Sequence, residues 1–327
     1  MSPGKLKSLL RPIISLAALG AIVYLVTADR SWRELFRVEA SALVLAMALN
    51  LLAQAITAVR WTAIGQGYGF AFSMRRYFAW YFAGLFSSVF LPSTLGGDAL
   101  RMIWISIADD PSRQDQPVSI RRWQAGTCVL WDRFLGLAAL VILGIPSLLT
   151  TNAIEQGLQR LPSWLSPLNL VIGLTLLAIG LTMFIRNNQS PLGQALRQAS
   201  SQALEALRRA KTHPALTALH GLYSLLIQLL GCTAVWVLAQ GLDMGLSARA
   251  ATDLFVISSL AILAPISING VGVREAVFAW YFRHQGGDPI DGALLGLIFT
   301  VSHTLVSLSG ALAFLRIINH PAPNPPN

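Results

Sequence analysis

Charged residues are scarce in this chain. Only 12% of its 327 residues are Asp, Glu, Lys or Arg, whereas a soluble globular protein carries about 25%. So few charges cannot cover a water-facing surface, and hydrophobic residues make up 54% of the sequence. The composition therefore excludes an ordinary soluble domain and predicts an all-α, polytopic integral membrane protein.

Cysteines and catalytic motifs are also scarce. The two cysteines, Cys128 and Cys232, form no CxxC pair, so neither a disulfide framework nor a zinc site is indicated. The sequence has no HExxH and no P-loop, and the adjacent Asp109 and Asp110 precede Pro111, which is typical of a polar turn. We therefore expect no metal, no cofactor and no catalytic residues.

Long apolar runs without charge are what the sequence does contain. A membrane-spanning helix needs about 20 mostly apolar residues, and six runs meet this need, at residues 12–28, 40–59, 134–154, 161–185, 214–242 and 292–315. We interpret the first as a retained helix rather than a cleaved signal peptide, because it is longer than a usual signal core. The chain is then a single transmembrane domain, residues 1–327, with a first half at 1–185 and a second half at 214–318. Between the halves, residues 186–213 predict either an amphipathic helix on the cytoplasmic surface or a plain solvated linker helix. The Pro-rich tail at 319–327 is predicted to be disordered.

Basic residues between the runs indicate orientation. The net charge is +9, but no basic–aromatic motif points to nucleic acid, so we expect no nucleic-acid partner. Cytoplasmic loops are enriched in Lys and Arg, and the most basic loop is 186–211. Counting from that loop places both termini in the cytoplasm, together with a loop holding Arg60, Arg75 and Arg76.

Two apolar segments, residues 77–108 and 253–282, must enter and leave the membrane on the same side. Each is broken in its middle by Pro, Gly and charged residues. The arm at 77–91 would be about 22 Å long at the helical rise, which is too short for a hydrocarbon core of about 30 Å. We therefore predict six full spans plus two re-entrant helical hairpins; the alternative is two pairs of tilted spans, which gives eight or more crossings.

The two breaks read PSTLGGDALR and PISINGVGVR. In register they align Pro92 with Pro265, Gly97 with Gly270 and Arg101 with Arg274. Interrupted helices at corresponding places in two halves indicate an inverted repeat and a transport site.

The breaks also predict a site for an anion. Half-helices that begin near Asp98 and Val273 would present free N–H groups, which bind phosphate, and each break carries an arginine. The alternative is that Asp98 and Arg101 form a structural ion pair and that the glycines serve close packing. The candidate substrate-binding residues are Pro92, Gly96, Gly97, Asp98, Arg101, Asp132, Arg133, Pro265, Asn269, Gly270, Gly272, Arg274, Glu275 and His303.

Several other polar residues within or beside apolar runs could have either a structural role or a role in the site. Asp132 and Arg133 precede the third run, as either a local pair at the cytoplasmic edge or part of the site. His303, in the last run, favours a helix–helix hydrogen bond over a site role, and Glu275 is a candidate proton carrier. Hydrogen bonds between helices are also predicted for Asn50, Gln54 and Gln228.

Four motifs resemble one family: RWTAIGQGYG, LPSTLGGDALR, WDRFLGL and INGVGVREAVF. Over about residues 10–318 the chain is similar to the flippase-like transmembrane region of lysylphosphatidylglycerol synthases. The resemblance implies a prokaryotic inner-membrane location and translocation of an anionic phospholipid or a polyprenyl-phosphate-linked lipid. The resemblance does not imply lysine transfer, because the soluble aminoacyl-transfer domain of the full-length synthase has no counterpart here. His303 stands where many relatives are expected to have Arg.

Three functions are compatible with the sequence. The leading hypothesis is a lipid transporter that is not an enzyme, with the lipid and the bilayer as its partners. The alternatives are a membrane enzyme that transfers a sugar or amino acid onto a lipid, and an accessory subunit of a lipid-modifying enzyme.

Overall fold

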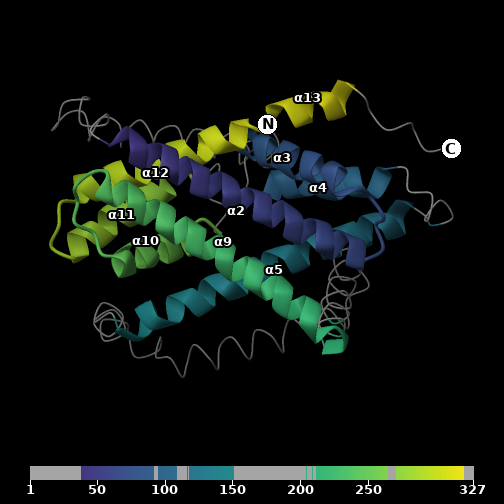
Figure 1. Cartoon of the computed structure of the whole chain (residues 1–327), viewed down its shortest axis with the longest axis horizontal. Coiled ribbons are helices and arrows are strands. Elements are labelled where there is room, and N and C mark those ends of the chain that lie inside the picture. The colour runs from purple at the N-terminus through teal and green to yellow at the C-terminus, as the bar shows by residue number, and fades with distance from the viewer. Residues whose placement is uncertain are drawn as a thin grey trace, which may run out of the picture. The chain divides into compact units, whose positions relative to one another are not determined.

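The computed structural model describes residues 38–91, 95–108, 116, 118–150, 204, 208, 211–263 and 270–319. Regular structure in these residues is entirely α-helical (Figure 1). The helices are α2 (Ala40–Gly67), α3 (Met74–Phe90), α4 (Leu95–Ile107), α5 (Val118–Thr150), α9 (Pro214–Gln240), α10 (Ala248–Ala261), α11 (Val273–His284), α12 (Pro289–Leu308) and α13 (Ala311–Asn319). The predicted spans at 12–28 and 161–185, most of the amphipathic helix at 186–213 and nearly all of the tail lie outside the described residues.

The chain divides into two compact units. The first comprises residues 1–144 and 220–327, and it contains both broken hairpins. The second, residues 145–219, includes the last residues of α5 and the first residues of α9. Everything that follows concerns the first unit.

Four helical stretches are long and apolar enough to cross a membrane: Ala40–Gly67, Ile120–Pro146, Pro214–Gln240 and Pro289–Asn319. They confirm a polytopic helical membrane protein and overlap the predicted runs at 40–59, 214–242 and 292–315.

Two predicted boundaries are wrong. The run at 134–154 was expected to start after Asp132 and Arg133, but α5 already begins at Val118. Arg60 was expected in a loop, but α2 continues to Gly67 and buries it. In both places charged residues continue the helix because partners on other helices neutralise them.

The broken hairpins consist of short helices. At a rise of about 1.5 Å per residue, α3, α4, α10 and α11 measure about 25, 20, 21 and 18 Å, all less than a hydrocarbon core of about 30 Å. In the first hairpin α3 and α4 meet at Gly84 and Gly97, where a Cβ on Gly97 would lie 2.2 Å from the Gly84 carbonyl oxygen. Re-entrant hairpins are the interpretation that these lengths favour.

The same order of helices occurs twice. A long helix, two short ones and a long one follow each other as α2 to α5, and again as α9 to α12. The long helices α2 and α9 run in opposite directions (Figure 1). The Glu39 N–H, just before α2, donates to the carbonyl oxygen of Gly241, just after α9, and Arg60 Nη1 near the end of α2 donates to Ser224 Oγ near the start of α9. This antiparallel order is what an inverted repeat predicts.

The sequence register of the repeat does not extend to the helices. Arg101 lies six residues after the first residue of α4, whereas Arg274 lies one residue after the first residue of α11. The two arginines therefore occupy different places in their hairpins, although the breaks align in sequence.

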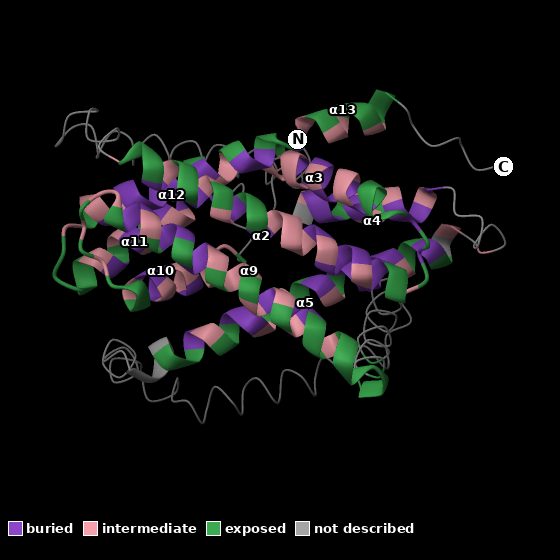
Figure 2. Ribbon diagram, viewed as in Figure 1, coloured by how far each residue is buried: buried purple, intermediate pink, exposed green. Residues whose placement is uncertain are grey.

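The interior of this unit is built from two hydrophobic clusters. One centres on Leu238, Leu254, Phe278 and Leu295, and joins α2 to the second hairpin and α12. The other is rich in aromatic side chains and surrounds the first hairpin. Figure 2 shows buried residues facing one another between helices and exposed ones outside. Large apolar side chains are among those outside, such as Leu222 at 61% exposure, as expected for a protein surrounded by lipid.

Candidate functional site

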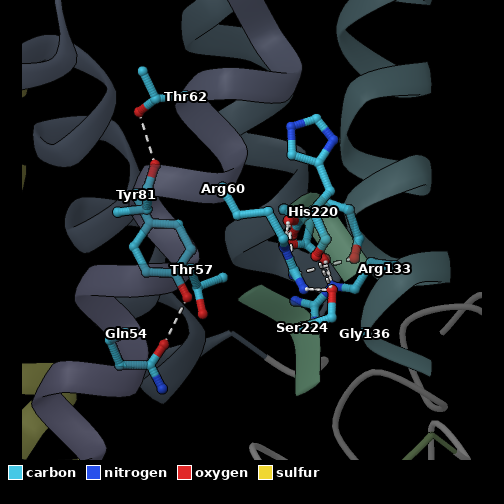
Figure 3. A network of polar contacts seen from close by, with 12 residues as sticks. Gln54, Thr57, Arg60, Thr62, Tyr81, Arg133, Gly136, His220 and Ser224 are labelled. Atoms are coloured by element: carbon cyan, nitrogen blue, oxygen red, sulfur yellow. Dashed lines mark hydrogen bonds and ion pairs between the residues drawn. The ribbon is translucent and has the colours of Figure 1, made fainter. Parts of the chain in front are cut away.

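A buried ion pair joins α2 to α5. Arg60 Nε donates to Asp132 Oδ1 at 2.9 Å, and Nη2 donates to the Asp132 carbonyl oxygen at 3.2 Å. The remaining nitrogen, Nη1, donates to Ser224 Oγ on α9 at 2.6 Å (Figure 3). Both charged side chains are 4% exposed. Every nitrogen of this guanidinium is thus used within the protein, so the pair fastens three helices together.

A second charged group lies next to the first. Asp98, in the first turn of α4, accepts from Arg101 through Oδ1 and from Arg133 Nε through Oδ2, the latter at 2.6 Å. Asp98 and Arg101 are three residues apart, the spacing at which helix side chains face each other. Asp98 therefore shares its carboxylate between its own helix and α5.

The two arginines of this group differ in exposure. The Arg101 guanidinium stacks over the rings of Trp61 and Tyr81, with its carbon 5.2 and 4.9 Å from their centroids. Its Nη1 is buried and has no hydrogen-bond partner among the described residues. The Arg133 side chain is instead 52% exposed, and it is the Nε of this guanidinium that donates to Asp98.

The predicted local pair of Asp132 and Arg133 is wrong. Consecutive helix residues do not face each other; Asp132 turns toward α2 and Arg133 toward α4. Both residues lie well inside α5.

The three arginines and two aspartates carry a net charge of +1. Arg60 and Asp132 cancel each other, whereas Arg101 and Arg133 share the single carboxylate of Asp98. A charge that is removed from water is costly unless it is paired. The arrangement is therefore able to accept one further negative charge.

The second hairpin holds its charges differently. The fully buried Glu275 accepts from the Gly272 N–H at 2.7 Å and from the Thr300 hydroxyl at 2.6 Å. Gly272 has a φ of 86°, which glycine adopts readily, and its N–H is one of those that a helix start leaves without a partner. Arg274 donates to Thr300 Oγ1 at 3.0 Å and stacks over Phe299. The Glu275 carboxylate thus caps α11 and is satisfied within the protein.

Polar side chains connect the first hairpin to α2 and α12. The Tyr81 hydroxyl donates to Gln54 Oε1 at 2.6 Å, and Gln54 Nε2 lies 3.3 Å from His303 Nε2. The hydrogen bonds predicted between helices are confirmed for Gln54 with His303, for Asn50 with Ser302, and for Gln228 with the Gly136 carbonyl oxygen.

Most of the predicted site residues fall into two groups. Asp98, Arg101 and Arg133 meet in one charged group, with Gly96 and Gly97 in the packed start of α4 beside them. Gly270, Gly272, Arg274 and Glu275 form the other, at the start of α11, and no hydrogen bond or ion pair of the described residues joins Arg101 to Arg274. Pro92, Pro265 and Asn269 lie outside the described residues.

Arg60 lies next to the charged group, and the sequence did not predict it as part of the site. Its signal was present, since a lone arginine continues the apolar run of α2, where a charge requires a partner. Where side chains are described, no group of three His, Cys, Asp or Glu could hold a metal ion.

Comparison with known proteins gives one family. The model of the lysylphosphatidylglycerol synthase TM region matches residues 9–310. No curated protein and no solved structure matches.

Proposed function

The chain belongs to the lysylphosphatidylglycerol synthase TM region family, and from that membership we propose that it is a lipid transporter. Its substrate is an anionic phospholipid or a polyprenyl-phosphate-linked lipid, whose headgroup passes through the protein while the acyl chains stay in the membrane. We also propose the prokaryotic inner membrane as its location, with both termini in the cytoplasm.

The observation that supports an anionic substrate is the unbalanced charge at α4 and α5. Arg101 and Arg133 share Asp98, which leaves one positive charge in excess, and half of the Arg133 side chain is exposed. Guanidinium groups bind phosphate oxygens with paired N–H donors. A lipid phosphate would supply the missing negative charge.

The helix geometry supports movement of the headgroup rather than chemistry on it. Broken helices are tolerated at membrane depth where they are buried in protein or line a water-filled cavity, and two such hairpins at corresponding places in two halves are typical of transporters. The acidic side chains of the charged group, Asp98 and Asp132, are both held by arginines, so both carboxylates are already engaged within the protein.

The test is lipid movement in vesicles that contain the purified full-length protein. Phosphatidylglycerol labelled on an acyl chain with a fluorophore is followed by reduction of the outer-leaflet label with dithionite, and acyl-labelled phosphatidylcholine serves as the zwitterionic comparison. We expect the wild type to move phosphatidylglycerol faster than phosphatidylcholine. Arg133→Gln should slow phosphatidylglycerol about 10- to 100-fold, the range that a hydrogen bond to a charged group is worth.

Arg75→Gln is the matched control, because Arg75 is exposed at the start of α3, outside the charged group. It should leave the rate unchanged. Equal rates for the wild type and a folded Arg133→Gln variant would remove the support for this site. Transfer of a labelled sugar or amino acid to lipid by the purified protein would favour a membrane enzyme instead, and activity only with a co-purified enzyme would favour an accessory subunit.

A further inference from the structure

Asp98 occupies the position that an anionic ligand would take. Its two oxygens each accept from a different arginine, Arg101 on the same helix and Arg133 on α5. A phosphate group that binds Arg133 would take over a donor that Asp98 now uses. Within the part of the chain that the structure describes, Asp98 is the only carboxylate in contact with either arginine.

The two arginines differ in their freedom to leave Asp98. Arg101 is 4% exposed and is enclosed by the rings of Trp61 and Tyr81, so it stays in place. Arg133 has a single protein partner among the described residues and is half exposed. Moving Arg133 from Asp98 to another anion breaks one hydrogen bond and disturbs no packed ring.

Asp98 itself is fixed by its backbone. The next residue back, Gly97, packs so closely on α3 that a Cβ would lie 2.2 Å from both the Gly84 carbonyl oxygen and Ser88 Oγ. The start of α4 therefore lies in direct backbone contact with α3. A phosphate must compete with the Asp98 carboxylate where it stands.

We propose that Asp98 is an internal competitor for the lipid phosphate. Without lipid, Arg133 is neutralised by Asp98; with lipid, Arg133 turns to the phosphate while Asp98 keeps Arg101. The carboxylate repels the bound phosphate and reclaims Arg133 when the headgroup moves on, so it weakens binding and speeds release. This inference rests on the proposed lipid-transport function and assigns Asp98 the role of setting affinity.

The test compares four proteins that differ in the formal charge of this group. Asp98, Arg101 and Arg133 together carry +1; Asp98→Asn gives +2, Arg133→Gln gives 0, and the double variant Asp98→Asn/Arg133→Gln returns to +1. Binding of a short-chain phosphatidylglycerol, dihexanoylphosphatidylglycerol, is measured by calorimetry on the full-length protein in a neutral detergent. Dihexanoylphosphatidylcholine serves as the zwitterionic control.

We expect Asp98→Asn to bind the phosphatidylglycerol about 10- to 100-fold more tightly than the wild type, the range of one charged hydrogen bond. The same variant should move labelled phosphatidylglycerol more slowly in vesicles, because release becomes limiting. Arg133→Gln should bind more weakly than the wild type, and the double variant should bind more tightly than Arg133→Gln.

The opposite order would overturn the proposal. If Asp98 only holds the arginines in shape, a folded Asp98→Asn protein binds more weakly than the wild type, and the double variant binds no better than Arg133→Gln. Should Asp98→Asn alone fail to fold, the comparison of the double variant with Arg133→Gln decides the question. If the wild type transports phosphatidylglycerol but Asp98→Asn does not bind it more tightly, only this inference is wrong. If the wild type neither binds nor transports phosphatidylglycerol, the proposed function is wrong.

Discussion

The ion pair of Arg60 and Asp132 should be worth more to folding than to lipid binding. Arg60→Met leaves the Asp132 carboxylate 4% exposed and without its cationic partner. Removal of one partner from a buried ion pair costs about 3–5 kcal/mol. Ser224 is spared a second penalty, because its hydroxyl keeps its bond to the His220 carbonyl oxygen at 2.7 Å.

A double variant distinguishes the value of the ion pair from the cost of leaving one of its charges buried alone. Leu has nearly the shape of Asp, so Arg60→Met/Asp132→Leu replaces the pair with apolar groups, and such replacements are often neutral or stabilising. We therefore expect each single variant to lower the free energy of unfolding by about 3–5 kcal/mol and the double variant to recover most of that loss.

Reversible unfolding in mixed detergent and SDS micelles, followed by circular dichroism, measures these differences. Arg75→Gln is again a suitable control, since Arg75 is exposed and should change stability by less than about 0.5 kcal/mol. A cost below about 1 kcal/mol for Arg60→Met, or a double variant as unstable as the sum of the single ones, would show that the pair does not fasten α2 to α5.

Two further predictions concern the free energy of unfolding in the same assay. Gly97→Ala should lower it by about 1–3 kcal/mol, because the new Cβ would clash with the Gly84 carbonyl oxygen. The control Gly221→Ala has nothing within 4 Å of its new Cβ and should raise it by up to about 1 kcal/mol through helix propensity, so equal stabilities of the two variants would contradict the close crossing. Tyr81→Phe should cost about 1–3 kcal/mol, because it deprives Gln54 Oε1 of its donor, and a loss under about 0.5 kcal/mol would mean that this link between α3 and α2 is unimportant.

Much of the architecture was accessible from the sequence, because charge-free apolar runs and helix breakers are local signals. The runs at 40–59 and 214–242 became α2 and α9, and the breaks after residues 91 and 263 separate short helices, as their Pro and Gly residues predict. The family could also be predicted, since two of its four motifs, LPSTLGGDALR and INGVGVREAVF, lie at these breaks.

The errors have a common physical cause. Arg60, Asp132 and Arg133 were treated as signs of a helix end, because charge disfavours burial in apolar surroundings. Their partners, however, lie on other helices, 72 residues apart for Arg60 and Asp132 and 35 for Arg133 and Asp98. Long-range pairing of this kind is a property of the packed structure, so a reading along the chain assigns each charge to the nearest loop.

The grouping of the candidate residues could not be predicted from the sequence. Asp98 and Arg101 share a face of α4 by spacing alone, but nothing local indicates that Arg133 completes their group. In the same way, the spacing of Glu275 from Gly272 is compatible with a helix cap, whereas the bond from Thr300 depends on how α12 packs against α11.

The close approach of Gly84 and Gly97 also constrains how the first hairpin can rearrange. At this crossing the backbones of α3 and α4 are in direct contact, and the side chains of Ser88 and Arg101 pack close beside it. We therefore expect α3 and α4 to move together if the hairpin rearranges. The natural place for a change of direction is the short connection between α2 and α3, where Gly69 has a φ of 85°.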